Sequence, residues 1–87
     1  MMSYLIAIIG TVFLLLSNVA LADIEDGVAA FLQGDYESAY SELQPYAQQG
    51  DPEAQFIIGR MCANGTAVPQ SDTEAMRWYL LSAEQGY

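Results

Sequence analysis

Hydrophobic residues after residue 22 recur three or four positions apart, and no sustained stretch alternates polar and apolar residues as a half-buried strand does. This pattern predicts an all-α fold, in which two antiparallel helix pairs follow an N-terminal apolar segment. The four expected helices lie within Ile24–Gln33, Asp35–Gly50, Asp51–Asn64 and Ser71–Gly86. The residues expected to be buried are Leu43, Ala54, Ile58, Ala75, Tyr79 and Ala83.

Polar and small residues mark the predicted helix ends. Asp35 and Asp51 stand where an N-cap is needed, because an aspartate side chain can accept from the free backbone amides of the first turn. Ser71 and Glu74 have the spacing of a capping box. Pro45 falls inside the second helix, where it removes one backbone hydrogen bond. The helix must either kink there or break into two short pieces, and we expect a kink, since the apolar spacing continues beyond it.

The chain begins with an apolar segment of a different kind. Leu5–Leu16 is almost continuously apolar, and the small-x-small triplet Ala20-Leu21-Ala22 follows shortly after it. This is the pattern of a secretory signal peptide, so residues 1–22 are predicted to be removed by cleavage between Ala22 and Asp23. An uncleaved membrane anchor is the alternative, although a spanning helix needs about 20 apolar residues and this run is shorter.

Charge is confined to the region that follows the apolar segment. All 11 acidic residues and both basic residues, Arg60 and Arg77, lie after Ala22, so this region carries the whole net charge of −9. Such a balance argues against nucleic-acid binding, which requires Lys and Arg to neutralise phosphates. It would instead steer a basic partner toward the chain.

The sequence lacks the residues that most catalytic and metal sites require. Nucleophilic catalysis usually needs a neighbouring base such as His, and the chain has no His. One cysteine, Cys62, permits no internal disulfide and no zinc site, and its place on an apolar helix face predicts a buried structural thiol. The acidic stretch Asp23–Gly27 lacks the spacing of a calcium loop. We therefore predict no catalytic residue, no metal site and no cofactor.

A short internal repeat is the most informative feature of the sequence. Ala47-Gln48-Gln49-Gly50 recurs as Ala83-Glu84-Gln85-Gly86, 36 residues later. The same offset aligns Ala39 with Ala75 and Leu43 with Tyr79. A unit of this length, composed of two helices and a glycine-centred link, is typical of helical solenoids.

Residues 51–86 are similar to a Sel1-like repeat, a relative of the tetratricopeptide repeat. Residues 34–50 resemble the divergent first unit that often precedes such repeats. The predicted organisation is thus a signal peptide at 1–22, a divergent repeat unit at 23–50 and a Sel1-like repeat at 51–87. The residues that carry the resemblance are Ala54-Gln55-Phe56, Ile58-Gly59, Asn64-Gly65, Val68-Pro69-Gln70, Glu74-Ala75, Trp78-Tyr79 and Ala83-Glu84-Gln85-Gly86.

Three positions depart from the family pattern. Cys62 replaces an aromatic residue, Ala67 replaces a glycine and Ser71 replaces an aspartate cap. The alanine should strain its turn if that turn requires a positive φ. Trp78 and Tyr79, which could stack on a ligand, are expected to be core residues at this spacing, with Tyr79 inward and Trp78 near the next unit.

The predicted signal peptide implies export, to the periplasm or as a secreted protein, and the resemblance implies a module that binds a protein or peptide and has no catalytic activity. One alternative is an envelope enzyme of the β-lactam-binding type known from cysteine-rich relatives, whose regularly paired cysteines are missing here. Another is a truncated fragment without independent function. The final helix concentrates large apolar residues that one buried face cannot hide, so we expect an uncovered patch, and with it either marginal stability or self-association of the free chain. These residues are Met76, Trp78, Tyr79, Leu80 and Leu81.

Overall fold

The computed structural model describes residues 24–87, and the predicted signal peptide and its cleavage position lie outside these residues. Residues 24–32 are helical and precede three further helices, α2 (Tyr36–Gln48), α3 (Pro52–Asn64) and α4 (Asp72–Glu84). No strand occurs between residues 24 and 87, which confirms the all-α prediction. Within the same range, no helix is both long and apolar enough to cross a membrane.

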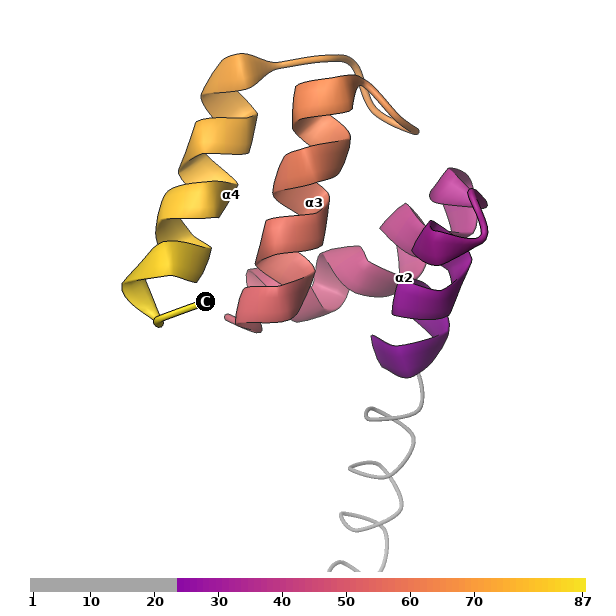
Figure 1. The fold of residues 1–87 in the computed structure, drawn as a ribbon, viewed down its shortest axis with the longest axis horizontal. Helices are drawn as coiled ribbons and strands as arrows, with labels where there is room; N and C mark the ends of the chain where they lie inside the picture. Colours follow the sequence, from indigo (N-terminus) through magenta and orange to yellow (C-terminus); the bar gives the residue numbers. More distant parts are fainter. Residues whose placement is uncertain (1–23) are drawn as a thin grey trace, which may run out of the picture.

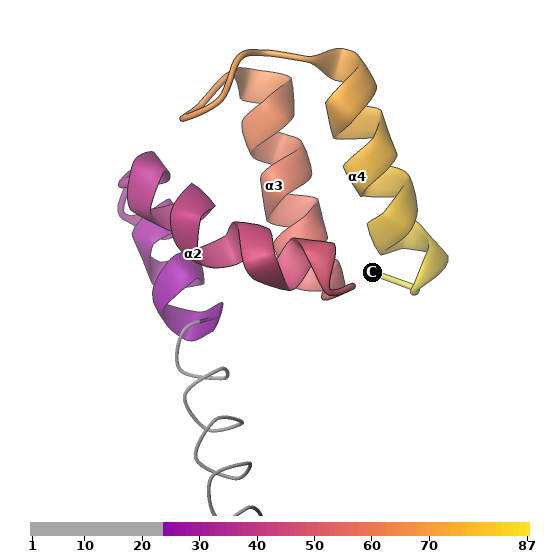
Figure 2. The ribbon, with the colours of Figure 1, turned by 180° about the vertical axis from the view of Figure 1, so that it is seen from behind.

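The helices pack in the order in which they follow one another. α3 and α4 lie side by side and run in opposite directions, and α2 crosses the lower end of α3 (Figures 1 and 2). The helical segment at residues 24–32 packs beside α2 in both views. α3 therefore has helical neighbours from both units. Within residues 24–87, the main packing partner of α4 is α3.

Helix starts follow the prediction from sequence. Asp35, Asp51 and Ser71 each accept a hydrogen bond from the backbone amide three residues ahead, at 3.5, 2.9 and 3.1 Å. The capping box at Ser71 is only half formed, however. The Ser71 amide donates to the Cys62 carbonyl at 2.8 Å, and the Glu74 carboxylate pairs with Arg77 instead of returning to the cap.

The second helix continues through Pro45 to Gln48. The Pro45 carbonyl still accepts a hydrogen bond from the Gln49 amide at 3.1 Å, so the helix is not divided into two pieces. Proline removes only its own donor, and the rest of the hydrogen-bond ladder carries the helix to its end.

The core lies along the contacts of α3 with its two neighbours. Its residues are Ala39, Leu43, Ala47, Ala54, Ile57, Ile58, Met61, Cys62, Ala75 and Trp78. Four of the six residues that the sequence predicts to be buried are confirmed, because Leu43, Ala54, Ile58 and Ala75 are at most 4% exposed.

The prediction for the last turns of α4 is wrong. Ala83 is exposed, and the buried residue is its neighbour Ser82, whose hydroxyl donates to the Pro52 carbonyl at 2.8 Å. Tyr79 is only half-buried, whereas Trp78 is buried and turned toward the preceding unit. A larger side chain at Ala83 would point into solvent and is therefore not expected to destabilise the fold by overpacking.

The two units repeat the same close helix contact. A Cβ on Gly27 would lie 2.7 Å from Leu43 Cγ, and a Cβ on Gly59 would lie 2.8 Å from Tyr79 Cδ1. Leu43 and Tyr79 are the residues that the 36-residue offset aligns. Each unit thus seats a large side chain of its second helix against a glycine of its first, although the two glycines are 32 rather than 36 residues apart.

Replacing Ala67 by glycine should stabilise the fold. Ala67 has φ 65°, in the left-handed region where a Cβ clashes with the backbone. Relief of that strain is partly offset by the greater freedom of glycine in the unfolded chain, so we expect a net gain of about 0.5–1 kcal/mol. Urea denaturation of the two proteins measures it, and an unchanged midpoint would show that this turn is unstrained.

Candidate functional site

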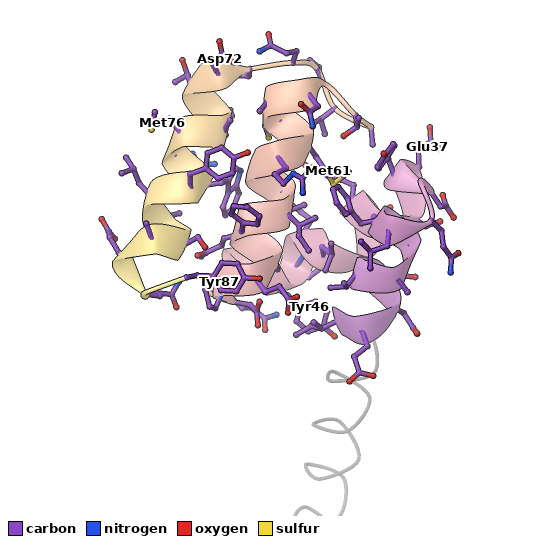
Figure 3. The ribbon with its side chains drawn as sticks, viewed as in Figure 1. Glu37, Tyr46, Met61, Asp72, Met76 and Tyr87 are labelled. Carbon is purple, nitrogen blue, oxygen red and sulfur yellow. The ribbon has the colours of Figure 1, made fainter. Side chains whose placement is uncertain are left out.

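One ridge of α4 is apolar and uncovered. Asp72, Met76, Leu80 and Glu84 follow one another at intervals of four residues, so they form one ridge on the helix surface, which turns by about 40° with each step. Met76 is 58% exposed and Leu80 is 55% exposed. Figure 3 shows Met76 on the side of α4 that faces away from α3, with Asp72 at the start of the helix. We call these four residues the α4 ridge.

The internal repeat shows what a covered version of this surface looks like. Shifting Met76, Tyr79, Leu80 and Ala83 back by 36 residues gives Tyr40, Leu43, Gln44 and Ala47 of α2. Leu43 and Ala47 are fully buried and the other two are half-buried, because α3 packs against α2. On α4, three of the four aligned residues are exposed and Tyr79 is half-buried. The difference is that α3 lies beside this face of α2, whereas no further helix of residues 24–87 lies beside the matching face of α4.

The chain leaves α4 with the same geometry with which it leaves α2. Gly50 and Gly86 both have positive φ, of 105° and 85°. The Asp51 amide donates to the Tyr46 carbonyl at 3.0 Å, and the Tyr87 amide donates to the Ser82 carbonyl at 3.3 Å. Each of these pairs is related by the 36-residue offset. The backbone at the end of α4 therefore directs the chain as the α2 exit directs it into α3.

A buried amide fixes the ends of the three helices relative to one another. Gln55 is 4% exposed, and its Nε2 donates to the Ala47 carbonyl at 3.1 Å. Its Oε1 accepts from Gln85 Nε2 at 2.8 Å. A buried amide with both ends paired is rigid, since losing either partner would leave a polar atom unsatisfied. Gln55 thereby joins the end of α2 to α3 and to the residue that follows α4.

Aromatic residues extend the apolar surface at the C-terminal end of α4. The Phe56 ring lies 5.6 Å from the rings of both Tyr79 and Tyr87. Phe56 is 38% exposed and Tyr87 is 58% exposed, so the cluster is open to solvent on one side. Figure 3 shows the Tyr87 ring in front of the lower end of α3.

A groove follows the opposite side of α4, between this helix and α2. Its two parts, of about 540 and 330 Å³, share Gln44, Arg77 and Trp78 as lining residues. Arg77 pairs with Glu74 at 2.8 Å and lies 4.6 Å from the centre of the Trp78 ring. The Glu74 hydrogen bond raises the pKa of Arg77, and the same ion pair balances the charge of this arginine locally. These contacts make the groove close to neutral.

Cys62 is a buried thiol, as the sequence predicts. It is 7% exposed, and burial raises the pKa of this thiol, with a further increase from Glu74 and a decrease from Arg77. A raised pKa means that less thiolate, the nucleophilic form, is present at neutral pH. Among residues 24–87, no cluster of three or more His, Cys, Asp and Glu is positioned to hold a metal ion.

A thiol reagent should modify Cys62 slowly while the chain is folded. At pH 8 we expect modification by a disulfide reagent to be on the order of 100-fold slower than in 6 M guanidinium, because the folded thiol is both covered and protonated. The rate in the folded state should rise with pH, since the raised pKa delays ionisation of the thiol. Equal rates in both conditions would contradict the burial of Cys62.

The sequence predicted an uncovered apolar patch on the final helix, but not the row of four residues that forms the α4 ridge. The expected uncovered patch is confirmed, because Met76, Leu80 and Leu81 are all exposed. Trp78, another large apolar residue of this helix, is buried, which confirms its expected place in the core. The fourfold spacing of Asp72, Met76, Leu80 and Glu84 was the available signal.

Comparison with known families agrees with this architecture. Residues 52–87 match the family model of the Sel1 repeat. This part of the chain is a Sel1 repeat. Comparison with curated proteins gives no match, and neither does comparison with solved structures. Sel1 repeats are helical modules that typically mediate protein–protein interaction and are generally not catalytic. The matched segment comprises α3, α4 and Tyr87, and so includes the whole of the α4 ridge.

Proposed function

We propose that this protein is an exported, non-catalytic Sel1-repeat module that binds another protein through the α4 ridge. The observation that carries the proposal is the repeat comparison. Four residues of α4, of which Met76 and Leu80 belong to the ridge, are more exposed than their counterparts in α2. α2 is packed between the first helical segment and α3, whereas α4 packs mainly against α3 within residues 24–87. A surface built like a helix interface, with no helix of residues 24–87 on it, is suited to receive one from a partner.

The energetics of the ridge support a binding role. Met76 and Leu80 each expose more than half of their surface. Burying that remainder would stabilise a complex by about 1 kcal/mol per residue, before the cost of association is subtracted. The ridge has an acidic residue at each end, and the neighbouring aromatic cluster of Phe56 and Tyr87 enlarges its apolar part. This surface therefore has the apolar centre and the polar edge of a protein interface.

A matched pair of variants tests the ridge in the organism that produces the protein. Leu80→Gln removes an apolar side chain from the ridge, whereas Leu32→Gln makes the same change at a residue that is 78% exposed on the first helical segment. Quantitative affinity capture should lose its specific partner with Leu80→Gln and retain it with Leu32→Gln. Equal capture by both variants would contradict a binding role for the ridge.

Export is supported by the apolar segment and the Ala20-Leu21-Ala22 triplet. N-terminal sequencing of the protein isolated from its host should find Asp23 as the first residue. An intact Met1 on protein from the membrane fraction would contradict cleavage and favour the anchor.

Self-association through the same face is the competing use of the ridge. Sedimentation at several concentrations distinguishes a second copy of this chain from a different protein. A monomer that binds its partner, with the Leu80→Gln variant defective only in that binding, is the result that the proposal expects. A dimer that Leu80→Gln dissociates would assign the ridge to a second copy.

A further inference from the structure

We infer that the partner presents an amphipathic helix whose apolar stripe has a cationic side chain near each end, about 12 residues apart. This inference rests on the proposed binding role of the α4 ridge and adds the chemistry of the occupant. Two independent observations carry it, one concerning shape and one concerning charge.

The shape of the site is that of a helix-binding surface. The aligned residues of α2 are covered by a helix, α3, and the exits of α2 and α4 have the same hydrogen bonds and the same left-handed glycine. Since the two surfaces are built alike, the element that fits α4 has the dimensions of α3. α3 itself spans 13 residues, which is enough to run along the whole ridge.

The charges of the ridge specify the ends of that helix. Asp72 stands at one end of the ridge and Glu84 at the other, 12 residues apart, which corresponds to about 18 Å along the helix axis. Both side chains are exposed. An apolar centre between two acids is complementary to an apolar stripe between two cations. Because both ends are acidic, a partner helix can satisfy them in either direction.

Neither arginine of the chain is placed to neutralise these acids. Arg77 forms its ion pair with Glu74, off the ridge, and stacks on Trp78. Arg60 lies on α3 and over the Phe31 ring, 5.4 Å from its centre. The net charge of −9 adds a long-range attraction for a basic partner. Asp72 Oδ1 accepts a hydrogen bond from Gln70 Nε2 at 2.7 Å, but neither ridge acid has a cationic partner within residues 24–87, so both can pair with a cation that arrives from outside.

Charge also disfavours a second copy as the occupant. In a two-fold contact between antiparallel ridges, Asp72 of each copy would face Glu84 of the other. Like charges would then meet at both ends of the interface without a compensating cation. The first helical segment of a second copy would fit the ridge no better, because its exposed residues include the acids Glu25 and Asp26, which would repel Asp72 and Glu84.

Two synthetic probes test the inference directly. Both are fluorescent amphipathic helices of about 17 residues with one leucine stripe. One carries Arg at two positions 12 apart beside the stripe, and the other carries Glu at the same two positions. Each is titrated by fluorescence anisotropy with the protein as isolated from its host. We expect the Arg probe to bind about tenfold more tightly than the Glu probe, with a preference that shrinks as salt is added.

Matched variants locate the origin of the preference. Asp72→Asn with Glu84→Gln should abolish most of it, whereas Glu25→Gln with Glu37→Gln, which changes the net charge equally at exposed sites elsewhere, should preserve it. The charge reversal of Asp72→Arg with Glu84→Arg should make the Glu probe the tighter ligand. Circular dichroism establishes that each variant keeps its helices.

The outcomes separate this inference from the proposed function. If the two probes bind equally, or if both paired neutralisations reduce the preference equally, the cationic partner is excluded. Loss of binding of both probes in Leu80→Gln would then still support the ridge as the binding surface. If Leu80→Gln binds both probes as well as the unaltered chain does, the ridge is not the site and both proposals fail. A dimer that excludes both probes would assign the ridge to a second copy and overturn the inference.

Discussion

Replacing Leu43 by alanine should cost about 2–5 kcal/mol of folding free energy, the largest effect expected of any single substitution considered for this protein. Leu43 is fully buried at the junction of α2, α3 and the first helical segment, with Gly27 directly against its side chain. Small domains are stable by about 5–15 kcal/mol in total, and a chain of this size is at the low end. The variant should therefore be largely unfolded at 37 °C.

Urea denaturation followed by circular dichroism measures this loss. Leu32→Ala is the matched control, because it deletes the same atoms from a side chain that is 78% exposed to solvent and not part of the core. The control should change the free energy of unfolding by less than about 0.5 kcal/mol. Equal losses in the two variants would show that Leu43 does not organise the first unit.

Replacing Gly59 by valine should separate α3 from α4. A Cβ at this position would lie 2.8 Å from both Cδ1 and Cε1 of the Tyr79 ring, a distance that side chains essentially never tolerate. Valine adds two further methyl groups, so the ring or the helix must move at a cost of about 1–3 kcal/mol. Because Tyr79 borders the Phe56 and Tyr87 cluster, the exposed aromatic surface should be rearranged as well.

A double-mutant cycle gives the physical cause of that loss. Tyr79→Ala removes the ring that Gly59→Val would strike. If the glycine is needed for close approach, the double variant should lose less stability than the two single variants do in sum. If the two losses of stability are additive, valine destabilises α3 by itself and does not clash with the Tyr79 ring.

Local features of the fold were predictable from the sequence because their causes are local. Asp35 and Asp51 cap their helices, and the repeated Ala-x-x-Gly segments end α2 and α4 in equivalent turns. The helix ends and the 36-residue repeat depend on chemistry within a few positions. The strain at Ala67 was foreseeable for the same reason, since the family pattern has glycine there and the observed φ is positive.

The rotation of α4 about its own axis could not be obtained in this way. Consecutive residues of a helix point in directions that differ by about 100°. Ser82 and Ala83 are both small, so the pattern of residue types in α4 did not determine which of them faces α3. The structure selects Ser82 because its hydroxyl reaches the Pro52 carbonyl, 30 residues away. Trp78 likewise turns toward the preceding unit, where α2 supplies the groove that contains it. Such tertiary contacts also leave the α4 ridge, the candidate site, facing solvent.

The half-formed capping box illustrates the same limit. Ser71 and Glu74 have the right spacing, yet the carbonyl of Cys62 competes for the Ser71 amide and Arg77 competes for the Glu74 side chain. The first competitor comes from α3 and depends on how the loop returns. The second is one turn further along α4, where an acid and an arginine three residues apart pair readily.

Protection of Met76 from oxidation would report directly whether a bound partner covers the α4 ridge. In the free chain, peroxide should convert the exposed Met76 to its sulfoxide readily and leave the fully buried Met61, an internal control, almost unchanged. Mass spectrometry of proteolytic fragments gives both rates from one sample. With the partner or the cationic probe bound, the account predicts that Met76 oxidation slows by about tenfold or more while Met61 stays protected. Oxidation of Met76 at the free-chain rate in a saturated complex would show that the partner binds elsewhere and would contradict the account.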